Sequence, residues 1–268
     1  MARTAKETKM IALIGHGYVG QHIAKELKAQ GIVFDWFNHK SRIPSSALAI
    51  INAAGYTGSP NVDACEHNKQ ACIEGNVVFP MRLERDYPYT PIVHITSGCV
   101  YTGYTDGGWT EDDAPNFNFR NGSFYSASKA LFQQLLNPNT KSYLLRIRLP
   151  FGDEDHPKNY LTKLKTYQKL IDFENSISYV NDVAATAIHF ARHLPKPGIY
   201  NVCNPGVVST RQVADMMGLQ KEWFTKEEFE AAVIAPRSNC NMSTAKLQNI
   251  FPIQSSTEAL RKAIHGQT

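Results

Sequence analysis

The sequence TSGCVY at residues 96–101 places a serine hydroxyl and a cysteine thiol two positions apart, directly after an apolar run. On an extended backbone, residues i and i+2 point to the same side, so Ser97 and Cys99 can address one ligand. Farther along, YSASK places Tyr125 and Lys129 four residues apart, hence on one face of a helix. A nearby ammonium lowers the pKa of a phenol towards neutrality, which favours a tyrosine that transfers a proton while Ser97 holds the reacting oxygen.

A glycine-rich turn, GHGYVG, directly follows the apolar run MIALIG and opens an amphipathic stretch. Glycines at this spacing between a strand and a helix allow a pyrophosphate to approach the backbone N–H groups at the helix N-terminus, where the helix dipole favours anions. The sequence therefore predicts a dinucleotide site formed by Gly15, Gly17, Tyr18, Val19 and Gly20.

The region about 20 residues beyond this turn distinguishes the two nicotinamide dinucleotides. An acidic residue there would hold the ribose 2'-hydroxyl, but residues 38–42 read NHKSR. Without a carboxylate, and with Lys40 and Arg42 beside Asn38, a 2'-phosphate is accommodated, so we expect NADPH. NADH stays open, because a shorter second strand would put Asp35 near the ribose and because Lys40 and Arg42 could belong to a solvated loop.

Composition bounds the class of protein. The 268 residues are 43% hydrophobic and 19% charged, as in a globular protein. No run of 18 apolar residues occurs, so we expect no membrane span. The N-terminal stretch MARTAKETK is polar and lacks the apolar core of a signal peptide, which predicts a frayed leader and a cytoplasmic location.

Charge and cysteine content narrow the partners. The net charge of +4 is small and its lysines and arginines are scattered, which argues against nucleic acid and favours an anionic small molecule. The five cysteines are odd in number and lack the paired C-x-x-C spacing of a zinc site, so we expect reduced thiols and no metal.

Short apolar runs alternate with amphipathic stretches of ten or more residues, which predicts an α/β protein with a parallel sheet built by right-handed crossovers. We expect strands at MIALIG, IVFDWF, ALAIINAAG, PIVHITS, SYLLRIRLP and GIYNVCNPG, and helices at VGQHIAKELKAQG, YSASKALFQQLL and VNDVAATAIHFARHL, with one or two helices over residues 62–87. The expected fold is a Rossmann-type doubly wound sheet with a small C-terminal substrate-binding cap. Residues 1–150 and about 178–204 would form the NADP-binding domain, and residues 151–177 and 205–268 the cap.

The order GHGYVG, NAAG, Ser97, Tyr125 and Lys129 resembles the extended short-chain dehydrogenase/reductase superfamily, whose members bind NAD(P) and act on nucleotide sugars. Between about residues 10 and 250 the resemblance narrows to the epimerase/reductase half of plant UDP-rhamnose synthases and, more distantly, to dTDP-4-dehydrorhamnose reductase and GDP-fucose synthase. The strings that carry it are NAAGYTGSPNVDACE, TSGCVY, APNF, GSFYSASKA, LRIRLP, HPKNYLTK, NPGVVS and APRSN. It implies that Tyr125 and Lys129 also contact the cofactor, together with Ala53, Ala54 and Gly55.

In that branch a nucleotide 4-keto-6-deoxyhexose is epimerised at C3 and C5 and then reduced at C4 with NADPH. The protons on C3 and C5 flank the ketone, so removing either gives an enolate that Ser97 and Tyr125 are placed to stabilise. Inversion requires an acid/base pair on opposite faces of the ring, which the resemblance assigns to Cys99 and to Lys163 of HPKNYLTK.

The resemblance also implies a nucleotide-sugar partner. The residues expected to bind it are Arg237, Asn159 and Asn116, and the expected conversion is of UDP-4-keto-6-deoxy-glucose to UDP-L-rhamnose. The plant branch carries threonine where this chain has Ser97, and both residues have a hydroxyl. It carries arginine where this chain has Ser59, and the serine removes a potential contact to phosphate or sugar. The choice among UDP, dTDP and GDP therefore stays open, and a homodimer is expected by analogy alone.

Two alternatives remain. One is a monofunctional 4-reductase fed by a separate epimerase, in which Cys99 is only a small buried hydrophobe. The other is a non-catalytic regulatory subunit that keeps the fold. The presence of Ser97, Tyr125 and Lys129 together argues against the second alternative, because a protein without catalysis has little chemical reason to keep all three.

Overall fold

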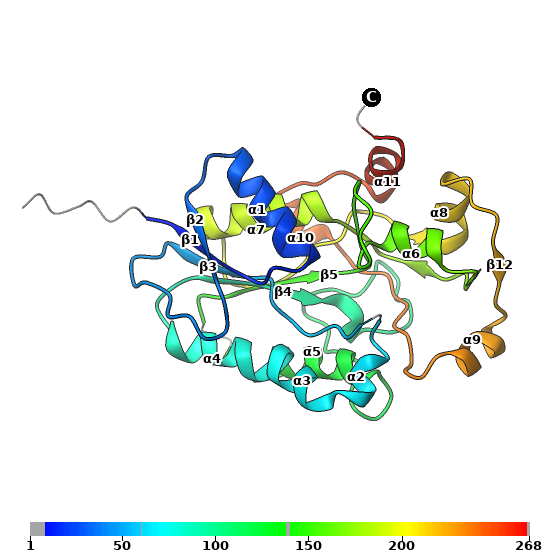
Figure 1. Ribbon diagram of the computed structural model, residues 1–268, viewed down its shortest axis with the longest axis horizontal. Coiled ribbons are helices and arrows are strands. Elements are labelled where there is room, and N and C mark those ends of the chain that lie inside the picture. The colour runs from blue at the N-terminus through cyan, green and yellow to red at the C-terminus, as the bar shows by residue number, and fades with distance from the viewer. Residues whose placement is uncertain (1–8, 60, 138–139, 267–268) are drawn as a thin grey trace, which may run out of the picture.

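The computed structural model describes residues 9–59, 61–137 and 140–266 (Figure 1). Except for Lys9, the N-terminal leader that we expected to fray lies outside the described residues.

A six-stranded parallel sheet forms the centre of the molecule. In spatial order its strands are β2 (Phe34–Phe37), β1 (Ile11–Ile14), β3 (Ala49–Asn52), β4 (Ile92–Ser97), β5 (Tyr143–Ile147) and β10 (Gly198–Asn201). The predicted α/β fold with a doubly wound parallel sheet is confirmed. Because the chain order reverses between β1 and β3, this position is the topological switch point at which such sheets bind ligands.

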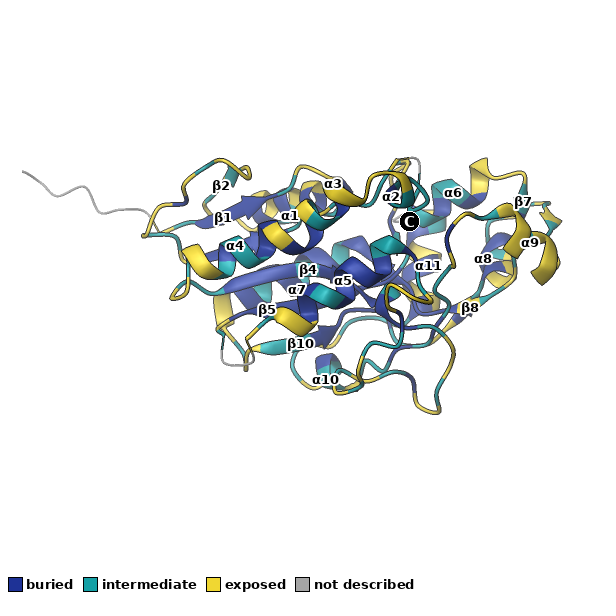
Figure 2. Ribbon diagram, turned by 90° about the horizontal axis from the view of Figure 1, so that it is seen from below, coloured by how far each residue is buried: buried dark blue, intermediate teal, exposed yellow. Residues whose placement is uncertain are grey.

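Helices cover both faces of the sheet. The helices α1 (Tyr18–Ala29) and α7 (Val180–His193) pack together on one face, and α3 (Lys69–Ile73), α4 (Phe79–Asp86) and α5 (Phe124–Leu135) lie on the other (Figure 1). Side chains of β1 alternate between these layers: Ile11 and Leu13 belong to the cluster that contains residues of α1 and α7, whereas Ala12 and Ile14 pack with residues of α4. The strands are therefore buried on both sides, which explains their continuous apolar runs (Figure 2).

The stretch expected to form one or two helices is more divided than predicted. It contains α2 (Ala64–His67), α3, a π-helical turn η1 (Glu74–Val78) and α4. Pro80 lies in the first turn of α4 and has no N–H to donate to the preceding turn. The wide turn places Asn76 so that its side chain donates to the Tyr56 carbonyl and accepts from the Tyr56 N–H, which ties the helix to the loop after β3.

A second apolar cluster holds the part of the molecule at the right of Figure 1 together; it includes Phe151, Leu161, Val213 and Leu260. The elements in this part of the molecule are β6 (Pro150–Phe151), α6 (Tyr160–Thr166), β7 (Lys169–Leu170), β8 (Glu174–Asn175), β9 (Ser178–Tyr179), β11 (Val208–Ser209), α8 (Thr210–Met216), β12 (Glu222–Trp223), α9 (Lys226–Ala232) and α11 (Ser256–His265). Leu247 of α10 (Ala245–Gln248) packs in the main core instead. The division of the chain into two domains stays a prediction.

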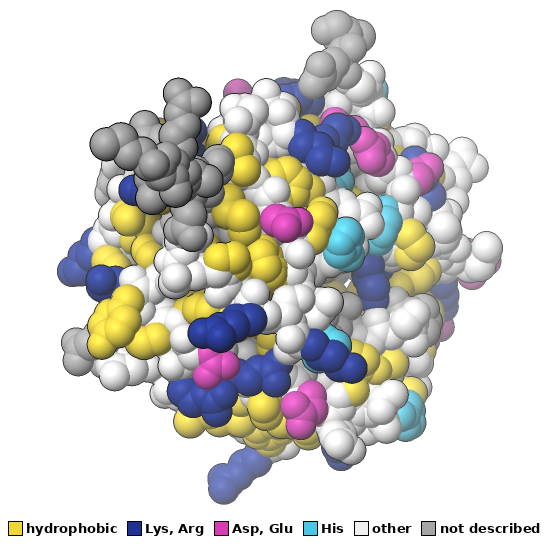
Figure 3. Space-filling model, turned by 60° about the vertical axis from the view of Figure 1, so that its left-hand side comes forward, with side chains coloured by type: hydrophobic (Ala, Val, Ile, Leu, Met, Phe, Trp, Pro, Cys, Tyr) yellow, Lys and Arg dark blue, Asp and Glu magenta, His cyan; other side chains and the backbone are white. Residues whose placement is uncertain are grey.

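The surface and the helix lengths bear on partners. Lys and Arg side chains lie among Asp and Glu on the face shown in Figure 3, with no continuous basic field across it. Within the described ranges, no helix is both long and apolar enough to cross a membrane.

The turn between β1 and α1 depends on two glycines. Gly15 has a φ of +101°, and a Cβ there would lie 2.5 Å from the Ala54 nitrogen. A Cβ on Gly20 would lie 1.8 Å from the carbonyl oxygen of Gly15. Gly17 differs from both, since a Cβ at that position would meet no atom within 4 Å. The first and third glycines therefore close the turn against the sheet, whereas the middle one faces open space.

Replacing these glycines should distinguish the one that closes the turn, Gly20, from the one that faces open space, Gly17. Gly20→Ala forces backbone atoms apart and should lower the free energy of unfolding by about 3 kcal/mol. Gly17→Ala, which meets no atom, should change it by less than about 1 kcal/mol. Urea unfolding of both variants beside the wild type measures the difference, and equal destabilisation by the two would contradict this account of the turn.

Candidate active site

A cavity of about 920 Å³ opens at the carboxyl ends of the central strands. Residues that follow β1, β3, β4 and β5 line one side of it, and residues of α6, β7 and the segment 232–239 line the other. The sequence-predicted residues that the cavity brings together are Gly17, Tyr18, Val19, Ala53, Ala54, Gly55, Ser97, Cys99, Tyr125, Lys129, Lys163 and Arg237. Gly15 and Gly20 lie behind this wall and shape the turn.

The glycine turn fits a dinucleotide. Gly17 precedes α1, a 12-residue helix with no acidic residue in its first turn, and the space beside Gly17 is free of protein atoms. Backbone N–H groups and the helix dipole can thus meet a pyrophosphate there. At the far end, a Cβ on Gly55 would lie 2.9 Å from the Lys129 ammonium, so glycine keeps this loop close to the predicted catalytic lysine. The cradle therefore runs from the α1 terminus to Lys129.

The residues expected near a 2'-phosphate lie outside the cavity wall. Asn38, Lys40 and Arg42 are exposed after β2, and the Asn38 side chain accepts from the Lys40 N–H at 2.8 Å in a local turn. Asp35 lies within β2, two residues before its end, and pairs in register with Ala12. The strand is therefore not short enough to end at Asp35, which was the condition for that carboxylate to approach the ribose.

Ser97, Tyr125 and Lys129 converge at the end of β4. The Ser97 hydroxyl accepts from the Cys99 N–H at 3.0 Å, and the Lys129 nitrogen lies 5.9 Å from the centre of the Tyr125 ring. Burial lowers the pKa of Lys129 to about 8. For Tyr125, burial raises the pKa and the nearby Cys99 adds to this, against a hydrogen bond from Ser97 that lowers it.

The sequence-based expectation that Lys129 brings the Tyr125 pKa towards neutrality is thus wrong, because burial raises this pKa. Burial is the largest influence on both groups, and it favours the neutral phenol of Tyr125 and the neutral amine of Lys129. Tyr125 therefore rests as the neutral phenol. That is the state from which it can give a proton to a substrate oxygen.

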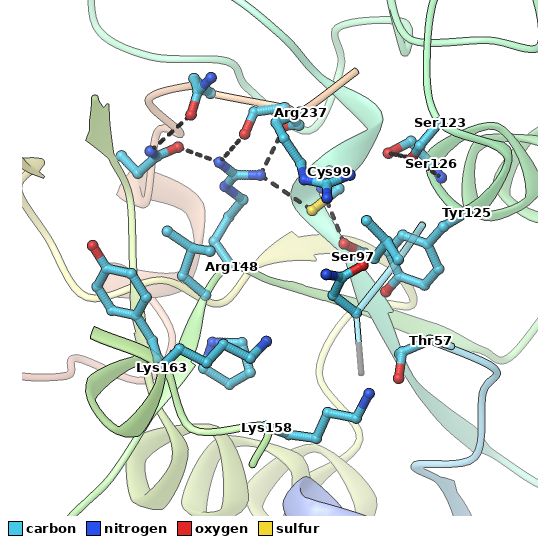
Figure 4. Close-up of a pocket in the computed structure, with 18 of the residues that line it drawn as sticks. Thr57, Ser97, Cys99, Ser123, Tyr125, Ser126, Arg148, Lys158, Lys163 and Arg237 are labelled. Carbon is cyan, nitrogen blue, oxygen red and sulfur yellow. Dashed lines mark hydrogen bonds between the residues drawn. The ribbon is translucent and has the colours of Figure 1, made fainter. Parts of the chain in front are cut away.

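Cys99 and Lys163 face the cavity from opposite sides (Figure 4). Cys99 lies in the short 3-10 turn η2 (Gly98–Val100) after β4, and Lys163 lies on α6. Burial lowers the pKa of Lys163, and the neighbouring Lys158 lowers it further. A sulfur and an amine therefore lie across the cavity from each other. This arrangement is the one required of two groups that act on opposite faces of a single ring.

The three residues expected to bind the substrate differ in position. Arg237 lines the cavity, and its guanidinium makes two hydrogen bonds of 2.7 and 2.6 Å to the carboxylate of Asp63. Asn159 caps α6 and donates to the carbonyls of residues 152 and 154, and Asn116 bonds both backbone groups of Thr102. Neither asparagine lines the cavity, so their predicted contact with substrate stays a prediction and both side chains serve loops in this structure.

The polar residues that line the cavity and that sequence reasoning missed include Thr57, Asp63, Arg148 and Lys158. Arg148 ends LRIRLP and Lys158 lies in HPKNYLTK, both of which had been singled out as strings. The signal that could have found Arg148 is a second arginine at the end of an apolar strand, because a charge in such a place needs a specific partner.

A family model described as the RmlD substrate binding domain matches residues 9–266. A bifunctional dTDP-4-dehydrorhamnose 3,5-epimerase/dTDP-4-dehydrorhamnose reductase of Arabidopsis thaliana is 33% identical over 92% of this chain and 89% of the relative. A trifunctional UDP-glucose 4,6-dehydratase/UDP-4-keto-6-deoxy-D-glucose 3,5-epimerase/UDP-4-keto-L-rhamnose-reductase of the same plant is 33% identical over 93% of this chain and 40% of the relative.

The crystal structure of the L780 UDP-rhamnose synthase from Acanthamoeba polyphaga mimivirus superposes with a TM-score of 0.85. The two chains are 25% identical, and the match covers 96% of this chain and 99% of that one.

Burial of Lys129 has a measurable consequence for stability. The unfolded chain keeps this proton up to about pH 10.5 and the folded chain only up to about pH 8, so the cost of burying the ammonium is largest below pH 8 and fades as the pH rises to 10.5. Lys129→Met should therefore raise the free energy of unfolding by roughly 3 kcal/mol at pH 7 and by far less at pH 10. Urea unfolding at both pH values measures this. Lys25→Met, at an exposed lysine paired with Glu154, is the control and should bring no gain at either pH; a Lys129→Met protein no more stable than wild type at pH 7 would refute the prediction.

Proposed function

The chain belongs to the family of RmlD substrate-binding domains, and from this membership we propose that it is an NADPH-dependent 3,5-epimerase/4-reductase of a nucleotide 4-keto-6-deoxyhexose. The observation that carries the proposal is the placement of Cys99 and Lys163 across one cavity from each other (Figure 4), in a cavity that Ser97, Tyr125, Lys129 and the glycine turn also line. A relative matched over 89% of its own length and named for both activities supports the same reading.

The reductive half-reaction uses the residues at the end of β4. NADPH, when bound along the cradle from Gly17 to Lys129, supplies the hydride for C4. The Ser97 hydroxyl holds the ketone oxygen, and the neutral Tyr125 phenol gives its proton to that oxygen. Lys129 keeps positive charge near the developing phenolate and the ribose.

The epimerising half-reaction uses the same ketone. Removal of the proton on C3 or C5 moves an electron pair onto the C4 oxygen, where Ser97 and Tyr125 stabilise the enolate. One of Cys99 and Lys163 takes this proton and the other returns a proton to the opposite face of the same carbon. The sugar ring must therefore lie between the sulfur and the amine, which is the open space visible in Figure 4.

The nucleotide end of the substrate would meet the cationic side of the cavity, where Lys158 and Arg237 lie. Exposed Lys40 and Arg42 beyond β2, with no carboxylate at the end of that strand, support NADPH over NADH. The printed names of the trifunctional relative and of the L780 synthase support UDP-4-keto-6-deoxy-glucose as substrate and UDP-L-rhamnose as product. A cytoplasmic location and a homodimer stay predictions.

The Tyr125 assignment predicts that the two activities can be separated. Tyr125→Phe removes the proton donor for C4 and should lower the rate of NADPH oxidation at least about 10²-fold. Exchange of solvent deuterium at C3 and C5 should persist, because Ser97 remains to hold the enolate. The assay supplies UDP-4-keto-6-deoxy-glucose and NADPH in deuterated water and follows nicotinamide absorbance and product mass. Tyr104→Phe, half-exposed and outside the cavity lining, is the control, and undiminished NADPH oxidation in Tyr125→Phe would exclude the assignment.

The Cys99 assignment decides between a bifunctional enzyme and a plain 4-reductase. Wild type should oxidise NADPH with the unepimerised sugar and give a product carrying two non-exchangeable deuterons. Cys99→Ala should reduce only a sugar supplied already epimerised, since it lacks one member of the acid/base pair. Cys65→Ala, at a buried thiol outside the cavity lining, is the matched control. Reduction by wild type without deuterium would leave a plain reductase and make Cys99 structural.

A further inference from the structure

Arg148 carries a buried positive charge with no carboxylate against it. The residue follows β5 and is 1% exposed, and no ion pair in the described part of the chain involves it. Its guanidinium donates to the Cys99 sulfur at 3.2 Å, to the hydroxyl and carbonyl of Ser238 at 2.8 and 2.9 Å, and to the side-chain oxygen of Asn175. Its Nε is buried and has no partner among the described residues.

A guanidinium stays charged at every ordinary pH, and burying a charge without a counter-charge is costly. Ser238 and Asn175 offer only neutral oxygens. Among the described partners of the Arg148 guanidinium, Cys99 is therefore the one that can become an anion. The arrangement of one buried cation and one sulfur acceptor is chemically complete when the sulfur is a thiolate.

The other titratable groups around this pair do not take that part. Burial raises the pKa of the Cys240 thiol and raises the pKa of the Cys203 thiol to about 12, so both stay neutral. Tyr104 and Tyr160 also feel the Arg148 charge, yet burial raises the pKa of each phenol. On the cavity side, Cys99 faces Tyr125, Lys129 and Lys163. Burial raises the pKa of the Tyr125 phenol, which stays neutral, and it lowers the pKa of the two lysines.

The backbone is built to let these two side chains meet. A Cβ on Gly98 would lie 2.3 Å from the Met242 sulfur and 3.0 Å from the Arg148 Cγ, so glycine lets the turn pack closely against both side chains. The glycine between Ser97 and Cys99 thus has a packing reason, which is chiefly Met242 and to a smaller extent Arg148. Ser238 and Asn175, from two other segments, also hold the guanidinium: the Ser238 hydroxyl accepts from the nitrogen that donates to the sulfur, and Asn175 accepts from the other terminal nitrogen.

We propose that Arg148 is a positioning residue for Cys99, holding its sulfur as a thiolate at one face of the sugar ring, so that Cys99 begins each inversion as the base and Lys163 as the acid. This inference rests on the proposed epimerase function. The thiolate takes the proton from the ring carbon, and the electron pair of the C–H bond becomes the enolate. The Lys163 ammonium then gives a proton to the opposite face of that carbon, and solvent returns thiol and amine to their starting states.

Alkylation of Cys99 tests the pair without any substrate, because iodoacetamide reacts with the thiolate and not the thiol. Full-length wild type, Arg148→Gln and Arg148→Lys are treated at several pH values, and modification of Cys99 is followed by peptide mass spectrometry. Arg148→Gln should react about tenfold more slowly at pH 7 and shift the pH profile upward, whereas Arg148→Lys, which keeps a charge, should lose less. Arg146→Gln is the matched control, since Arg146 is equally buried two residues away but bonds Tyr101 and Gln133.

The same variants are then assayed with sugars. Deuterium exchange should fall in parallel with alkylation, while reduction of an already epimerised sugar should stay within about threefold of wild type. An Arg148→Gln protein that folds and alkylates at the wild-type rate overturns the inference, as does a raised KM for reduction, which would place Arg148 on the substrate itself. If Arg148→Gln does not fold, Arg148→Lys and the wild-type profile decide, since a wild type that alkylates like a free thiol also overturns it. Absence of deuterium exchange in a wild type whose alkylation depends on Arg148 would instead sink the epimerase proposal and leave the pair standing.

Discussion

Burial of positive charge around an open cavity is the constraint on which the rest of the site depends. The cations that line it are Lys129, Arg148, Lys158, Lys163, Lys169 and Arg237, and among the described lining residues Asp63 is the only acid. Burial lowers the pKa of Lys129, Lys158 and Lys163, because these charges have left water without gaining counter-charges. Ligands with phosphate groups supply the missing negative charge, so the site gains most from the partners that the proposed chemistry requires.

The parallel sheet makes that concentration of charge tolerable. Strands β1, β3, β4 and β5 are largely apolar and buried on both faces, so the stability of the fold comes from the sheet and its two helical layers. The polar residues that line the cavity gather where the strands end, at the switch point between β1 and β3 and along the neighbouring strand ends. The functional groups thus sit on rigid elements but outside the core, where their desolvation subtracts from stability without breaking the packing.

Sequence patterns found the parts of this site that depend on short-range order. A glycine turn after a strand, and a tyrosine and lysine one helical turn apart, are local features, and the strands and helices that carry them appeared where the patterns placed them. Contacts between distant segments left no such trace. Arg148 meets Cys99 across 49 positions and Arg237 meets Asp63 across 174, and neither partner could be read from spacing. The Tyr125 pKa was also misjudged, because the sequence shows that a lysine is near and not how deeply both groups are buried.

The cations that line the cavity differ in how far their charge is already compensated. Arg237 is held by Asp63 in a bidentate pair, so an arriving diphosphate would gain little from its charge unless it displaced that carboxylate. Lys158 donates only to a carbonyl oxygen, that of Gly58, and Lys163 has no hydrogen bond from its ammonium within the described chain, so their charges are uncompensated. The electrostatic attraction for the diphosphate therefore rests on these lysines more than on Arg237. Because Lys163 is also the proposed acid, an anion bound beside it would favour its charged form and keep it ready to give a proton.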